Sequence, residues 1–189
     1  MLKSNFFVLT GGPGAGKTTL IEHLRSQGEL CVDETARAVI REQAASGGTA
    51  LPWGDQQAYW RETSRRDVAL YDGLAGETRA VFFDRGVVDD LAWARTADFA
   101  PDPDLVAQLE ARACNVHVFT FPPWAEIYVQ DAERKQDFAE AVRTYDRIVA
   151  TLWRLDYRVV EVPKTTVAAR ADFLRGVIAQ VSTKARSST

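Results

Sequence analysis

The sequence predicts an α/β fold, with a parallel β-sheet covered by helices on both faces. Apolar runs of strand length alternate along the chain with stretches of helical periodicity, which is the order that builds a parallel sheet. Most of the apolar runs are nearly continuous, as is typical of strands buried on both faces. The 189 residues are 46% hydrophobic and 26% charged. We therefore expect a single domain over residues 1–181, and wholesale disorder is excluded.

Five segments are predicted to be strands of this sheet. They are Asn5–Thr10, Glu29–Asp33, Ala80–Asp84, Val116–Phe121 and Tyr157–Val162. Because stretches with helical features separate them, we expect the strands to pair in parallel.

Helical periodicity is clearest over Asp137–Leu155, where apolar residues recur at the three-four spacing of one helix face. The same spacing returns over residues 174–181, and Thr165 or Thr166 is expected to cap that helix. Gln56–Tyr71 is also predicted to be helical, although its apolar face is poorly defined. The small, polar residues 182–189 are expected to form a disordered tail.

Charge and cysteine content exclude several classes of function. Lys and Arg number 23 against 26 Asp and Glu, a net charge of -3, so an overall basic field for nucleic acid is absent. No stretch resembles a signal peptide or a membrane span, so we expect a cytoplasmic protein without nucleic-acid or membrane partners. Cys31 and Cys114 are too few for a disulfide framework, and two buried free thiols are expected.

A phosphate-binding loop follows the first predicted strand. Its residues are Gly11, Gly12, Pro13, Gly14, Ala15, Gly16, Lys17 and Thr18, followed by Thr19. They satisfy G-x-x-x-x-G-K-[ST] between a strand and a helix, where backbone N–H groups and the helix dipole bind phosphate. Lys17 is expected to reach the β- and γ-phosphates, and the Thr18 hydroxyl to bind Mg²⁺. ATP and Mg²⁺ are therefore the predicted ligands.

A second Mg²⁺ ligand is predicted at Asp84, where the third strand ends, because ligands of open α/β sheets lie at the carboxyl ends of the strands. The alternative is that Asp84 caps the next turn. Arg85 follows, where motor ATPases carry a Glu that activates water; an Arg cannot act as a base but can bind phosphate oxygens. A structural Arg85 paired with Asp89 or Asp90 is the alternative. GTPases are disfavoured, because the D-x-x-G and N-K-x-D motifs are missing.

The phosphoryl acceptor is expected near the end of the second strand. Asp33 and Glu34 follow that strand, and a carboxylate beside the phosphate loop can take the proton of an acceptor hydroxyl. Which of the two is the base stays open. Helix capping by Asp33 or Thr35 explains these residues almost as well.

The motifs resemble those of known families. The phosphate loop is similar to that of adenylate kinase and other small-molecule P-loop kinases. Asp84-Arg85-Gly86 resembles the Asp/Glu-Arg step of deoxynucleoside and thymidylate kinases. Glu34 and Arg37 resemble the Glu-x-x-Arg stretch of the ribosylnicotinamide kinase domain in NadR-type proteins. With the Pro-Pro-Trp run at 122–124, the chain resembles small stand-alone AAA-domain P-loop proteins, a group of predicted ATPases and kinases.

The resemblance implies a three-layer α/β/α fold with strand order 2-3-1-4-5. It also implies a lid whose Arg134, with Lys135 as second candidate, closes over the phosphates and excludes water. Arg85 would face the transferred phosphoryl group or the acceptor. The expected catalytic residues are thus Lys17, Asp33 or Glu34, Arg85 and Arg134.

The function expected from these residues is Mg²⁺-dependent transfer of the ATP γ-phosphoryl group to a nucleoside-, nucleotide- or cofactor-precursor-like molecule. Two alternatives stay open. One is an NTPase that uses hydrolysis as a switch with a protein partner. The other is a nucleotide-binding regulator with little turnover.

Overall fold

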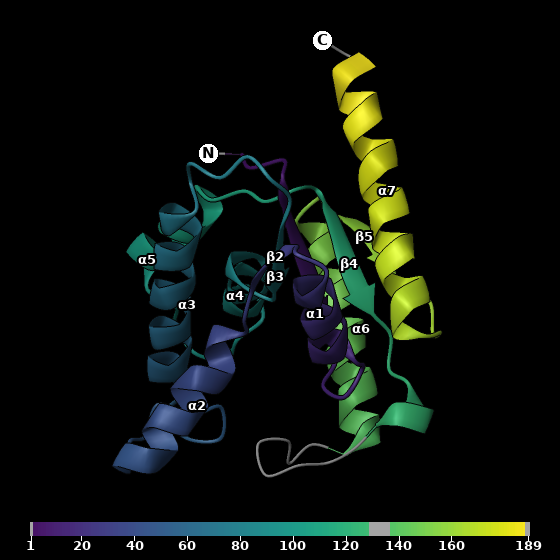
Figure 1. The fold of residues 1–189 in the computed structure, drawn as a ribbon. Coiled ribbons are helices and arrows are strands. Elements are labelled where there is room, and N and C mark those ends of the chain that lie inside the picture. The colour runs from purple at the N-terminus through teal and green to yellow at the C-terminus, as the bar shows by residue number, and fades with distance from the viewer. Residues whose placement is uncertain (1, 129–136, 188–189) are drawn as a thin grey trace.

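A five-stranded parallel sheet forms the centre of the molecule, for which a computed structural model describes residues 2–128 and 137–187 (Figure 1). The strands are β1 (Phe6–Gly11), β2 (Leu30–Val32), β3 (Val81–Asp84), β4 (His117–Phe121) and β5 (Arg158–Glu161). Their order is β2-β3-β1-β4-β5, and each neighbouring pair is parallel. The predicted strands and their order are confirmed.

Helices cover both faces of the sheet (Figure 1). One face packs against α1 (Lys17–Ser26) and α7 (Val167–Ser187), and the other against α3 (Gln56–Gly73), α4 (Val87–Ala94), α5 (Pro103–Glu110) and α6 (Phe138–Arg154). Helix α2 (Thr35–Ser46) follows β2, and the short 3-10 helix η1 (Ala125–Ile127) follows β4. The three-layer arrangement is therefore confirmed.

Strand β1 divides the core into two clusters. Phe6 and Val8 pack in the cluster with α3–α6, whereas Phe7 and Leu9 pack in the cluster with α1 and α7. All four are buried, because successive side chains of a strand point to opposite faces. A central strand covered on both sides is thus apolar throughout, and this pattern made β1 predictable.

Helix α7 is longer than predicted, and helix α4 was not predicted. Helix α7 continues to Ser187, beyond residue 182, where the disordered tail was expected to start. Because residues 182–187 contain no Gly or Pro, nothing in them breaks the helix. Residues 188 and 189 lie outside the described part. The cap is confirmed, because Thr166 Oγ1 accepts a hydrogen bond from the Ala169 N–H at 3.3 Å. Helix α4 is mostly apolar and buried, so it lacks the two-faced periodicity that predicts a surface helix.

Both cysteines are free thiols, as predicted, although Cys31 is only half-buried. Burial raises the pKa of Cys31 to about 11 and that of Cys114 to about 12, so neither is a reactive thiolate at neutral pH. Within the described residues, every helix is too short or too polar to span a bilayer.

Candidate active site

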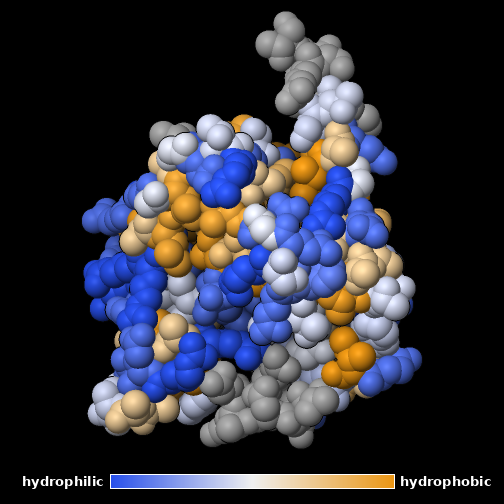
Figure 2. Space-filling view, viewed as in Figure 1, coloured by the Kyte–Doolittle hydropathy of each residue, from blue (hydrophilic) through white to orange (hydrophobic). Residues whose placement is uncertain are grey.

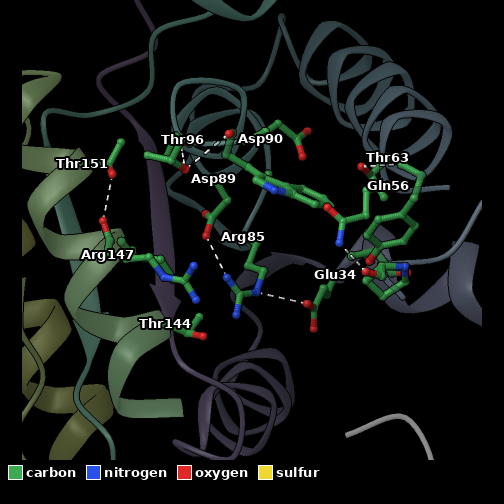
Figure 3. A pocket seen from close by; sticks show the side chains of 18 of the residues that line it. Glu34, Gln56, Thr63, Arg85, Asp89, Asp90, Thr96, Thr144, Arg147 and Thr151 are labelled. Atoms are coloured by element: carbon green, nitrogen blue, oxygen red, sulfur yellow. Dashed lines mark hydrogen bonds and ion pairs between the residues drawn. The ribbon is translucent and has the colours of Figure 1, made fainter. Parts of the chain in front are cut away.

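Functional side chains gather where β1, β2 and β3 end. A cavity of about 580 Å³ lies there, with walls supplied by α2, α3, α4 and α6 (Figure 3). On the face seen in Figure 2, hydrophilic side chains predominate toward this end of the sheet, and apolar side chains gather nearer the opposite end. The carboxyl edge of a parallel sheet is where α/β proteins bind their ligands, so this cavity is the candidate active site.

The phosphate loop joins β1 to α1 with backbone angles that favour glycine. The φ angle is +142° at Gly11, +71° at Gly14 and +80° at Gly16, a region in which L-residues are strained. A Cβ on Gly11 would lie 2.5 Å from the backbone oxygen of Phe121, and one on Gly14 would lie 2.6 Å from the Tyr128 ring. The loop can therefore offer bare backbone amides to a phosphate.

Lys17 is buried inside this loop. Its Nζ donates hydrogen bonds to the carbonyl oxygens of Gly12, at 3.2 Å, and Gly11, at 3.4 Å. Burial, together with the positive charge of Arg85, lowers the pKa of Lys17 to about 8. An anion bound in the loop would offset this cost, since it favours the charged ammonium.

Thr18 and Asp84 form the candidate magnesium site. Thr18 Oγ1 donates to Asp84 Oδ2 at 3.5 Å, and Asp84 Oδ1 is buried without a hydrogen-bond partner. Burial raises the pKa of Asp84. Mg²⁺ prefers oxygen ligands and often binds through one or two carboxylates plus phosphates and water, so this pair fits the ion. The described residues form no cluster of three or more Asp, Glu, His or Cys that would hold a metal without such ligands.

Arg85 occupies the centre of the site (Figure 3). Its Nε lies 3.0 Å from Glu34 Oε1, its Nη1 lies 2.9 Å from Asp89 Oδ1, and its Nη2 donates to the Gly11 carbonyl at 2.6 Å. Burial alone would lower the pKa of Arg85, but the carboxylates of Glu34 and Asp89 raise it above its ordinary value. Arg85 thus contacts the end of β1 at Gly11, and the alternative pairing with Asp89 is present.

The structure separates the two carboxylates that the sequence left equivalent. Glu34 lines the cavity with a side chain 16% exposed, between Arg85 and Arg37. Burial alone would raise the pKa of Glu34, but the positive charges of Arg85 and Lys17 hold that pKa below its usual range. The Asp33 side chain is 79% exposed and pairs with Arg25 at 2.5 Å. Asp33 therefore lies outside the site, contrary to the expectation that it is an equal candidate.

The other predicted residues are placed as follows. Residues 11–18 form the end of β1, the phosphate loop and the start of α1, and Thr19 is exposed on the first turn of that helix. Arg134 and Lys135, the lid candidates, lie outside the described residues.

Two buried aspartates on the α3 and α4 walls were not predicted as site residues. Asp67 is 9% exposed and Asp90 7% exposed, and both line the cavity. Thr35 Oγ1 donates to Asp67 Oδ1 at 2.8 Å. Burial raises the pKa of Asp67 to about 6, and burial and the Asp67 charge raise that of Asp90 well above its ordinary value. The helical repeat could have predicted the burial of Asp67. This residue follows the buried Trp60 by seven positions, or about two turns, and therefore lies on the same face of α3.

Arg170 anchors α7 to the phosphate loop from the opposite side. Its guanidinium lies 4.6 Å from the centre of the Trp124 ring. It donates to the carbonyl oxygens of Pro163, at 3.0 Å, and Ala15, at 3.3 Å. The loop is thus held by Arg85 on one side and Arg170 on the other.

Comparisons with known proteins agree with this geometry. The sequence model of a family described as an AAA domain matches residues 6–170. No curated protein matches the chain. Solved structures with a similar fold include a NadR protein in complex with NR, at 20% identity and a TM-score of 0.57. That match covers 94% of this chain and 50% of that chain, so the chain spans half the length of that NadR protein.

Two further similar structures are kinases. Deoxyadenosine kinase from M. mycoides is 11% identical with a TM-score of 0.55, and the match covers 93% of this chain and 99% of that chain. Thymidylate kinase from Candida albicans is 13% identical with a TM-score of 0.59, and the match covers 94% and 92% respectively. These likenesses show a P-loop kinase fold.

The buried ammonium of Lys17 predicts that this residue lowers the stability of the free protein. The pKa of Lys17 is about 8 in the folded protein, below its ordinary value of 10.5. The loss of folding stability that this shift causes is therefore complete below pH 8 and disappears as the pH approaches 10.5. Lys17→Met is therefore expected to raise the free energy of unfolding by about 2–3 kcal/mol at pH 7, and by less than about 1 kcal/mol at pH 10.

Urea denaturation at the two pH values measures both differences. Lys164→Met is the control, because Lys164 is exposed, and its effect should stay within about 0.5 kcal/mol. A Lys17→Met variant that is less stable than the wild type at pH 7 would contradict this interpretation.

Proposed function

The chain belongs to the AAA-domain family, and from this premise we propose that it is a small-molecule kinase. The reaction is transfer of the γ-phosphoryl group of ATP, with Mg²⁺, to a hydroxyl of a nucleoside-, nucleotide- or cofactor-precursor-like acceptor. The kinase fold of similar structures supports this proposal.

The observation that carries the proposal is the position of Arg85. Its guanidinium contacts both the phosphate loop, at Gly11, and the carboxylate of Glu34 in the cavity wall. Motor-type ATPases carry a Glu directly after the Mg²⁺-binding Asp to activate water, but Arg85 stands in that position here, and an Arg cannot act as a base. The adjoining cavity of about 580 Å³ falls within the size range of small-molecule sites. A second substrate therefore has room beside the transferred group.

Each residue then has a task. The loop amides and Lys17 bind the phosphates, and Thr18 and Asp84 hold Mg²⁺, which neutralises phosphate charge when bound. Glu34 accepts the proton of the acceptor hydroxyl, for which its ionised state is required. Arg85 stabilises the charge on the transferred group, and Arg134 keeps its predicted role in the lid.

The experiment that tests the proposal measures ADP formation from Mg-ATP, alone and with pooled acceptors. The pools contain nucleosides, nucleoside monophosphates, sugars, vitamin precursors and aminoglycosides, and Lys17→Ala provides the blank. At least one pool is expected to raise ADP formation about tenfold or more, because closing over an acceptor completes the site. Rapid basal turnover that no pool changes would instead identify a hydrolytic switch.

Glu34 and Asp33 offer a matched pair of variants for the catalytic base. Glu34→Gln is expected to lower acceptor-dependent kcat by about 10²–10⁴-fold, because the amide cannot take the proton. Binding of ATP, measured by calorimetry, should change little. Asp33→Asn should keep kcat within about twofold of the wild type, since Asp33 is exposed and paired with Arg25. Equal losses in the two variants would refute the assignment of Glu34.

A further inference from the structure

We propose that Asp67 and Asp90 select the acceptor: an alcohol whose far end carries nitrogen hydrogen-bond donors, neutral or cationic, with anionic acceptors rejected. This inference rests on the proposed function and deepens it, because it names the substrate class. It concerns the α3 and α4 walls of the cavity, away from the phosphate loop.

Polar groups lie buried next to one another in the α3 and α4 walls. The Asp90 carboxyl group interacts with Asp67 and with the hydroxyl of Ser64, one helical turn before Asp67 on α3, while its Oδ2 atom makes no hydrogen bond of regular geometry. Asp90 and Ser64 are more than nine-tenths buried, and Asp90 lines the cavity. Two carboxyl groups have more acceptor sites than these contacts use, so a ligand that donates hydrogen bonds from the cavity finds acceptors at Asp67 and Asp90.

The surroundings of Asp67 and Asp90 are acidic. Burial raises the pKa of Asp67, the hydrogen bonds with Thr35 and Asp90 oppose the rise, and the like charges of Asp89 and Glu34 add to it. Burial and the Asp67 charge raise the pKa of Asp90 well above its ordinary value, and burial raises that of Asp67 to about 6, so protonation of one carboxyl group relieves the repulsion between the two. Two carboxyl groups in this state accept N–H donors and attract a cation.

Among the described residues that line the cavity, each arginine is already paired with a carboxylate. Acidic residues line it in excess over arginines: Glu34, Asp67, Asp89, Asp90, Asp98 and Glu140 against Arg85 and Arg147. Arg147 pairs with Glu140 at 3.1 Å, and Arg85 is held by Glu34 and Asp89. A carboxylate or phosphate on the acceptor would therefore meet like charges.

Aromatic side chains complete the wall. Tyr59 and Trp93 pack edge to face, with ring centroids 5.6 Å apart, and both line the cavity. Aromatic surface beside a carboxyl pair suits a planar ring that bears an amino, amidine or carboxamide group.

The test uses three fragments of one shape and different charge: benzamidine, benzamide and benzoate. Their binding to the full chain is measured by calorimetry at pH 7 without ATP, and the indole N–H signal of Trp93 in NMR spectra reports occupancy of this cavity. Benzamidine is expected to bind about tenfold or more tightly than benzoate, with benzamide between them, because the wall is anionic.

Asp67→Asn and Asp90→Asn are each expected to weaken benzamidine binding about tenfold, whereas Asp33→Asn leaves it unchanged. Benzoate binding as tightly as benzamidine would overturn the proposal, and so would folded Asn variants that bind benzamidine like the wild type. If an Asn variant fails to fold, the ranking of the fragments on the wild type, with the Trp93 signal, decides. The fragments bear no hydroxyl, so this result is independent of whether the pooled acceptors reveal phosphoryl transfer.

Discussion

The buried guanidinium of Arg85 is the interaction on which the rest of the site depends. It links the end of β1, through Gly11, to Glu34 after β2 and to Asp89 on α4. Its backbone has a φ of 67°, a conformation that costs a non-glycine residue about 1–3 kcal/mol. A buried charge requires partners on every side, and removing one typically costs about 3–5 kcal/mol. The network therefore holds the phosphate loop and the acceptor wall in one fixed relation.

Arg85 also divides the site electrostatically. On one side lies the ammonium of Lys17, whose pKa is lowered to about 8 by burial and by Arg85 itself, in a loop shaped for anions. On the other side lie the carboxyl groups of Asp67 and Asp90. In the proposed reaction, the phosphate-bearing donor and the non-anionic acceptor would occupy opposite halves of the site, with Glu34 between them. Such preorganised charge is the largest contribution that a kinase makes to its reaction.

The strands and the phosphate loop were predictable because their signals are local, whereas the order of the strands was implied by the resemblance to P-loop kinases. The apolar run of β1 and the spacing of residues 11–18 each report a nearby backbone requirement. The choice between Asp33 and Glu34 was not predictable, because these neighbours differ chiefly in the direction of their side chains. Glu34, the N-cap residue of α2, points into the cavity, whereas Asp33 points toward Arg25. Asp67 and Asp90 lie close together because α3 packs against α4, and no local sequence pattern predicts that packing.

The most direct test of the central role of Arg85 is a double-mutant cycle with Glu34. The acceptor-dependent kcat/KM is measured for Glu34→Gln, Arg85→Gln and the double variant. Because the two side chains form one unit, we expect a coupling energy of at least about 2 kcal/mol, so that the double variant loses about 30-fold less than the product of the single losses. Losses that multiply, with coupling below about 0.5 kcal/mol, would show that the two residues act independently and would contradict this role.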